Sequence, residues 1–390
     1  MTQPPQPPFL MYVMWHPDSV DAAAVADRIR EHFQSPRFRH VAGGERMEVL
    51  FHSARNPNAA PFDVAWDATC PVAIVVMIDG AVARHAEWVR YVRSLGERAE
   101  SEGLRTRMVP VLMESSVLDR ISPDEQAIRW DRWHDSTEEP TSRLLRDLTY
   151  ECYRMLRHDL DQTRPRNEDA AKLGGYLDKV RVFLSHSKHD EHGSALANEI
   201  RRWLHAHTAL SSFFDVTDIP AGVRFSQVIA HQLEHSVMLA IYTDSYSSRE
   251  WCRREVIAAK RHGVPMVVAD CLQDGDDRAF PYLGNVPVVR MNPVSRDRVP
   301  RVIARLLDEV LRDMLWRTRV EALPEHRAHL TFMGRPPEFV SLAARTVEPD
   351  QRGVLVHPDP PLGDEERALL GTAWGNLRLL SMSQWLAEAP

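Results

Sequence analysis

The chain of 390 residues has few cysteines, and no spacing arranges them in pairs. Thiols without a CxxC motif argue against a disulfide scaffold and are typical of a reduced protein. The four are Cys70, Cys152, Cys252 and Cys271. An excess of positive charge is also missing, because 48 basic residues stand against 55 acidic ones and the formal net charge is −7. We therefore expect no direct binding to nucleic acid.

Long apolar segments are absent as well. The longest run, Pro71–Ile78, is much shorter than the roughly 20 residues that cross a bilayer. No positive charge precedes Arg28, so the sequence predicts neither a secretory signal nor a transit peptide. Together these features predict a cytoplasmic protein that does not contact a membrane.

The remaining composition is that of a folded chain with more than one domain. Hydrophobic residues make up 44% and charged residues 26%, a balance typical of globular proteins. At roughly 150 residues per domain, the length predicts two or three domains. We expect the following order: a disordered Pro-rich tail over 1–9, an α/β domain over 10–156, a linker over 157–175, a second α/β domain over 176–320, and a small C-terminal α/β lobe over 321–390.

Short apolar runs alternate with amphipathic stretches in both large domains. In the first, strands are predicted at 10–15, 71–78 and 108–113, with helices at 20–33, 82–99 and 141–156. In the second, strands are predicted at 181–186, 211–216, 237–243, 265–269 and 286–291, with helices at 193–207, around 225–233, at 248–262 and at 299–320. A further strand, turn and helix are predicted within 353–370. Continuously apolar strands between helices indicate a doubly wound parallel sheet of the flavodoxin-like kind.

The segment YSSREWCRREV, residues 246–256, predicts a helix start. Ser247 followed three residues later by Glu250 matches the S-x-x-E capping box, which would begin the helix at Ser248. Tyr246 and Trp251 are spaced for a hydrophobic staple across that start.

Several chemically useful side chains follow predicted strands. Trp251 and Glu255 are four residues apart, so they share one helix face. Asp190 is expected to cap the helix after the first strand of this domain, Asp215 ends the second, and the loop Thr217–Gly222 follows it. In open α/β sheets the carboxyl ends of the strands form the ligand crevice. We expect these elements to meet there, where an aromatic ring beside a carboxylate would suit a flat cationic heterocycle.

Three stretches in this order, FLSHSKHD, FFDVTDIPAGVRF and SSREWCRREV, resemble the motifs of bacterial Toll/interleukin-1 receptor (TIR) domains. The resemblance covers about residues 180–320. It implies an NAD⁺ glycohydrolase that acts in anti-phage defence, by depleting NAD⁺ or by making a cyclic ADP-ribose signal. Glu255 stands at the position of the catalytic glutamate, and Trp251 at that of the accompanying aromatic residue. It also implies that active domains complete their sites by stacking on a neighbouring subunit.

The remaining site residues are assigned with the resemblance in view. Phe183, Ser185 and Asp215 are expected to line the nicotinamide–ribose side, and the loop containing Asp218, Ile219 and Gly222 to gate the crevice. The substrate is NAD⁺, and we expect no cofactor and no metal. The histidines of the segment His186–His192 need not converge, because they span a strand end, a loop and a helix start.

Cleavage of the bond between nicotinamide and ribose requires little more than one carboxylate. Nicotinamide leaves as a neutral base, so no general acid is required. The developing ribosyl cation needs a nearby negative charge, much as in glycosidases. Glu255 has no obvious partner acid, which fits that demand, and Cys252 is interpreted as a small core hydrophobe.

Two other functions remain open. One is a TIR scaffold that acts by self-association, with Glu255 a bystander. The other is a nucleoside deoxyribosyltransferase-like enzyme, which also uses a glutamate on a doubly wound sheet. The first domain could be a degenerate TIR-like unit: Trp88 would correspond to Trp251, but Val92 stands where the carboxylate would be. We expect it to serve assembly or to sense an unknown activator.

Overall fold

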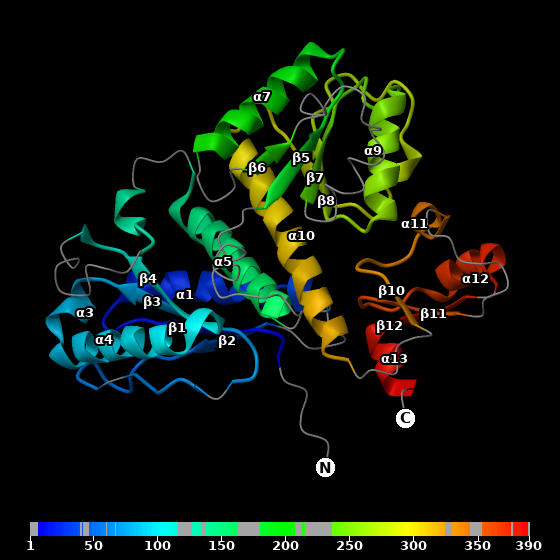
Figure 1. The fold of residues 1–390 in the computed structure, drawn as a ribbon. Helices are drawn as coiled ribbons and strands as arrows, with labels where there is room; N and C mark the ends of the chain where they lie inside the picture. Colours follow the sequence, from blue (N-terminus) through cyan, green and yellow to red (C-terminus); the bar gives the residue numbers. More distant parts are fainter. Residues whose placement is uncertain are drawn as a thin grey trace. The chain divides into compact units, whose positions relative to one another are not determined.

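The computed structural model describes residues 7–39, 41, 47–59, 61–66, 68–115, 127–133, 138–162, 180–206, 212–214, 236–323, 330–343, 353–375 and 377–388. The chain divides into two compact units, Met1–Tyr176 and Leu177–Pro390. Figure 1 shows the helices and strands of each. No helix in the described ranges combines the length and the apolar character needed to cross a membrane.

The first unit is built on a four-stranded parallel sheet with the order β2-β1-β3-β4. Its strands are β1 (Leu10–Met14), β2 (Glu48–Phe51), β3 (Val72–Ile78) and β4 (Thr106–Leu112). All seven residues of β3 are buried, so both faces of the sheet are covered. The helices are α1 (Val20–Phe33), α2 (Pro36–Arg39), α3 (Gly80–Arg84), α4 (Ala86–Ser101) and α5 (Pro140–Gln162), with 3₁₀ turns η1 (Gly103–Arg105) and η3 (Trp130–Arg132).

Several predicted boundaries in this unit were wrong. Residues 82–99 do not form one helix, because Asp79 caps α3 by accepting hydrogen bonds from the backbone of Ala81 and Val82, and His85 is extended between α3 and α4. Strand β2 was not predicted. Helix α5 continues to Gln162, where a linker was expected, and His158 within that extension is buried.

The second unit contains a five-stranded parallel sheet with the order β6-β5-β7-β8-β9. This 2-1-3-4-5 order is the flavodoxin-like arrangement, in which the crevice lies between the first and third strands. The strands are β5 (Arg181–Ser185), β6 (Ser212–Phe214), β7 (Ser236–Tyr242), β8 (Met266–Asp270) and β9 (Val288–Arg290), and the helices are α7 (Glu191–Ala206), α9 (Glu250–Arg261) and α10 (Arg298–Glu321), with the 3₁₀ turn η6 (Pro281–Leu283).

The predicted strands of this domain are all present, and the doubly wound fold is confirmed. The helix expected around 225–233 lies outside the described residues. The core between the sheet and α9 includes Phe183, Met238, Tyr246 and Val256.

The C-terminal lobe is larger than one strand–turn–helix. It holds a three-stranded parallel sheet with the order β10-β11-β12. Its elements are β10 (Leu330–Phe332), α11 (Phe339–Ala343), β11 (Gly353–His357), α12 (Asp364–Ala373), β12 (Leu377–Ser381) and α13 (Met382–Glu388). Strands β10 and β12 were not predicted, because Thr331 and Arg378 interrupt their short apolar runs.

Candidate functional site

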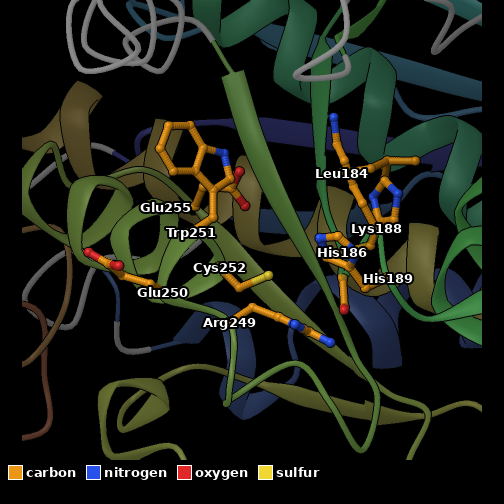
Figure 2. Close-up of a pocket in the computed structure, with 10 residues that line it drawn as sticks. Leu184, His186, Lys188, His189, Arg249, Glu250, Trp251, Cys252 and Glu255 are labelled. Atoms are coloured by element: carbon orange, nitrogen blue, oxygen red, sulfur yellow. The ribbon is translucent and has the colours of Figure 1, made fainter.

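A cavity of about 380 Å³ opens between the end of β5 and the start of α9, the helix that follows β7. One wall is the segment after β5, including His186, Lys188 and His189, and the other is the first turns of α9, including Trp251 and Glu255 (Figure 2). The cavity therefore occupies the switch point of the sheet, where α/β domains bind their ligands.

Glu255 is a buried acid at this wall. Its side chain comes from the second turn of α9, and the residue is only 3% exposed. The Ser185 hydroxyl, at the end of β5, donates a hydrogen bond to Glu255 Oε2 at 2.5 Å. A second hydroxyl, Tyr246 Oη, lies 2.6 Å from Ser185 Oγ. Since the single Ser185 proton points to the carboxylate, the Tyr246 hydroxyl donates to Ser185.

This arrangement fixes the direction of the hydrogen bonds. Burial, with the nearby Cys252 and Glu255, raises the pKa of Tyr246 well above its usual range, so its hydroxyl keeps its proton. The chain of donors therefore runs from Tyr246 through Ser185 to Glu255, which orients the carboxylate and supports its charge.

The neighbouring thiol is not a nucleophile. Burial, and secondarily the charge of Glu255, raise the pKa of Cys252 to about 12. The thiolate form is required for nucleophilic attack. Cys252 therefore stays protonated and packs as a small core residue.

Trp251 lies at the rim of the cavity. It is 39% exposed, and the Arg254 guanidinium stands 5.9 Å from the centre of its ring. Arg254 also pairs with Glu250 at 2.6 Å. The indole thus presents a partly exposed aromatic surface next to the cavity.

A second polar network holds the loops that shape the cavity. The carboxylate of Asp190 accepts hydrogen bonds from the backbone N–H groups of His192 and Gly193, at 2.9 and 3.2 Å, and so caps α7 as predicted. The Ser245 hydroxyl lies 3.2 Å from Asp190 Oδ2 and 3.0 Å from Ser187 Oγ. These contacts join the segment after β5 to the turn after β7.

The predicted capping box before α9 does not form. The helix begins at Glu250, and its N-cap residue, Arg249, makes no side-chain cap. The Ser247 hydroxyl instead donates to the carboxylate of Asp276. The predicted hydrophobic staple between Tyr246 and Trp251 is also wrong. Tyr246 is fully buried against the ring of Phe280, with ring centroids 5.7 Å apart, whereas Trp251 lies at the cavity rim.

The structure brings together some of the predicted site residues and not others. Glu255 and Ser185 are hydrogen-bonded, and Trp251 lines the same cavity. Phe183 is buried in the hydrophobic core and is not among the residues that line the cavity. Four other predicted residues lie outside the described ranges: Asp215, Asp218, Ile219 and Gly222.

Sequence reasoning missed the hydroxyl of Tyr246 and the cationic side chains of Lys188 and Arg249 at the cavity. Lys188 is the third residue after β5, and that position at a strand end was the available signal. Within the described ranges, His186, His189 and His192 do not gather into a metal-binding cluster.

The second unit thus contains a doubly wound parallel α/β domain with a buried carboxylate at its switch point. Residues 182–298 match the family model of the TIR domain. This segment of the chain is therefore a TIR domain, and the expected resemblance to TIR domains is confirmed for it.

Other comparisons add little. No curated protein matches the chain. Among solved structures, the chain is similar to the glycotransferase of kitacinnamycin, with 12% identity, coverage of 81% of this chain and 95% of that chain, and a TM-score of 0.21. It is also similar to a proposed phosphosugar isomerase from Silicibacter pomeroyi DSS-3, with 10% identity, coverage of 81% and 87%, and a TM-score of 0.19. Likenesses this weak carry no argument about function.

Proposed function

We propose that this protein is an NAD⁺ glycohydrolase that cleaves the bond between nicotinamide and ribose. The observation that carries the proposal is the buried Glu255 carboxylate in the cavity at the switch point of a TIR domain. The exposed face of Trp251 at the cavity rim supports it, because a nucleotide ring can stack there.

Glu255 would stabilise the positive charge that develops on the ribose as nicotinamide departs. A charge next to a forming cation is most effective when it is already oriented and partly shielded from water. The hydrogen bond from Ser185 supplies that orientation, and burial supplies the shielding. Water, or a group of the same nucleotide, then attacks the cation, which would give ADP-ribose or its cyclic form.

In a cell this activity would deplete NAD⁺ or release a nucleotide signal. We place it in anti-phage defence, switched on when an activator brings copies of the chain together. The reaction needs no cofactor, because the leaving group already carries a positive charge in NAD⁺.

The direct experiment is chromatography of the products formed from NAD⁺ by the purified full-length protein, at high concentration. Release of nicotinamide supports the proposal. A parallel incubation with deoxynucleosides and a free base tests the deoxyribosyltransferase alternative. Exchange of bases without nicotinamide release would favour that enzyme, and no reaction in either assay at any protein concentration would favour a non-catalytic scaffold.

A further inference from the structure

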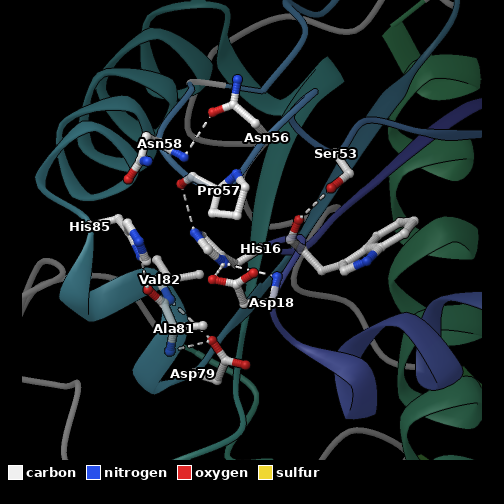
Figure 3. Close-up of polar contacts among 11 residues, drawn as sticks. His16, Asp18, Ser53, Asn56, Pro57, Asn58, Asp79, Ala81, Val82 and His85 are labelled. Atoms are coloured by element: carbon white, nitrogen blue, oxygen red, sulfur yellow. Dashed lines mark hydrogen bonds and ion pairs between the residues drawn. The ribbon is translucent and has the colours of Figure 1, made fainter.

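A cluster of possible metal ligands lies in the first unit. It consists of His16, Asp18 and His85, whose ligand atoms all lie within 4.8 Å of one another (Figure 3). His16 and Asp18 follow β1, and His85 follows β3 beyond the short helix α3. In the order β2-β1-β3-β4 these two strands flank the point where the chain reverses direction across the sheet, which is the ligand crevice of such folds.

The hydrogen bonds of the two imidazole rings define which nitrogen of each carries the proton. His16 Nε2 lies 3.0 Å from the carbonyl oxygen of Pro57, and His85 Nδ1 lies 2.9 Å from the carbonyl oxygen of Ala81. A carbonyl can only accept, so both of these nitrogens are donors. The lone pairs are therefore on His16 Nδ1 and His85 Nε2.

This pattern is typical of metal-binding histidines. A ligating imidazole usually donates its other N–H to a backbone carbonyl or a carboxylate, which fixes the ring and its tautomer. The two rings stack, with centroids 4.2 Å apart and planes at 23°.

A carboxylate completes the set. Asp18 Oδ2 is 3.9 Å from His16 Nδ1, and the Asp18 side chain is exposed, which leaves a path from solvent. Two ligands with bonds of about 2.0–2.1 Å to one ion lie no more than about 4.2 Å apart. The His16–Asp18 pair already meets that limit. The lone pairs of the two nearly parallel rings lie in their ring planes, so His85 has to tilt out of the stack before both can reach one ion. The backbone N–H of Asp18, now 3.2 Å from His16 Nδ1, has to give up that contact.

We propose that His16, His85 and Asp18 bind a divalent transition-metal ion such as Zn²⁺. Two imidazole nitrogens and one carboxylate oxygen suit zinc and its neighbours, whereas Mg²⁺ and Ca²⁺ prefer oxygen ligands throughout. Three protein ligands leave a coordination position for water or for a ligand of the first unit. The cluster shares no residue with the cavity of the TIR domain, so this proposal does not rest on the proposed NAD⁺ cleavage.

The test is isothermal titration of the untagged full-length protein with Zn²⁺, repeated with Co²⁺ while its visible absorption is recorded. One ion per chain is expected, with a cobalt spectrum typical of nitrogen and oxygen ligands. His85→Ala and Asp18→Asn should each weaken binding by about tenfold or more. Asp18 is exposed, so its variant should melt at the wild-type temperature.

Two matched variants serve as controls, His52→Ala and Asp21→Asn. They make the same chemical changes on the same unit, outside the cluster, and should leave binding unchanged. Absence of Zn²⁺ binding by the wild-type protein would overturn the proposal. Binding that survives both His85→Ala and Asp18→Asn would place the ion elsewhere and would overturn it equally.

Discussion

At the scale of single residues, the orientation of the Glu255 carboxylate depends on the hydroxyl beside it. Ser185 is fully buried and joins Glu255 to Tyr246. Ser185→Ala would leave a buried carboxylate and a buried phenol without this partner. Loss of a hydrogen bond to a charged group should reduce turnover roughly tenfold and lower the free energy of unfolding by about 1–3 kcal/mol.

The measurement pairs NAD⁺ turnover with urea unfolding, and Ser248→Ala is the control. Ser248 is exposed and donates to the carbonyl of Ser245 at 2.7 Å, in the turn before α9. It should match the wild type in both assays. Equal turnover by the Ser185 variant would show that the hydrogen bond does not serve catalysis.

Trp251 gives a prediction that separates binding from stability. Because the indole is 39% exposed and does not staple the helix, Trp251→Ala should change the melting temperature little. Lost stacking on a nucleotide ring is worth about 1–3 kcal/mol, so KM for NAD⁺ should rise about tenfold or more. Trp251→Phe should keep most of the affinity. An unchanged KM in the Ala variant would remove the indole from the binding site.

Sequence reasoning reached part of this site. The four-residue spacing predicted that Trp251 and Glu255 share one face of a helix, and both line the cavity. The contact between Ser185 and Glu255 joins residues 70 positions apart, so no local pattern contains it. Tyr246 was predicted to be a staple, and its hydroxyl role depends on the same long-range packing.

At the scale of secondary-structure elements, Asp190 fixes the start of α7 and, through Ser245, the turn after β7. Asp190→Ala should lower the free energy of unfolding by about 1 kcal/mol at neutral pH, as for other N-caps. Asp190→Asn should retain most of this stability, because an amide oxygen can also accept the hydrogen bonds of the N-cap. Urea unfolding checks both, and equal loss in the two variants would contradict capping.

The same residue predicts a pH dependence. Burial acts to raise the pKa of Asp190, but hydrogen bonds from Thr243, Gly193, Ser245 and His192 outweigh it, and the pKa is lowered. A carboxylate with a lowered folded pKa stabilises the fold above its unfolded pKa of about 3.9. That contribution is lost as the pH falls through the folded value. Wild type should therefore lose stability below about pH 4 more steeply than Asp190→Asn.

The helix starts show why local signals succeed or fail. Asp190 caps α7 as predicted because its carboxylate finds the first N–H groups of its own helix. Ser247 carries an equally good local signal, yet its hydroxyl binds Asp276 from a loop 29 residues later. The hydrogen bond to the charged carboxylate of Asp276 replaces the capping box, and α9 begins at Glu250, later than predicted.

At the scale of the whole molecule, the composition and the alternation of strands and helices were enough to predict the doubly wound parallel fold of the second unit. Strands β2, β10 and β12 each combine few apolar residues with a polar one, Glu48, Thr331 and Arg378, so they lack a continuous apolar run. The sheets of the first unit and the lobe were therefore incompletely predicted. The cluster of His16, Asp18 and His85 was also missed, because the ligands come from different strand ends.

The cavity also predicts dependence on assembly. Its rim holds the exposed Trp251 and Glu250, and preorganised charges act more strongly where water is excluded. Stacking against a second copy would supply that exclusion. We expect NAD⁺ cleavage per protomer to rise with protein concentration, measured over a wide dilution series with mass photometry. Full activity in a dilute monomer would contradict the assembly requirement.

The central claim is that the buried carboxylate of Glu255 stabilises the ribosyl cation during NAD⁺ cleavage. Comparison of Glu255→Gln with Glu250→Gln tests this claim most directly. Both changes neutralise a glutamate of α9 at the same cavity, but the Glu250 side chain is 67% exposed and pairs with Arg254. Nicotinamide release should fall by about 10²–10³ in Glu255→Gln, as for loss of one preorganised electrostatic contact, and stay near the wild-type rate in Glu250→Gln. Wild-type turnover by a folded Glu255→Gln protein would contradict the account.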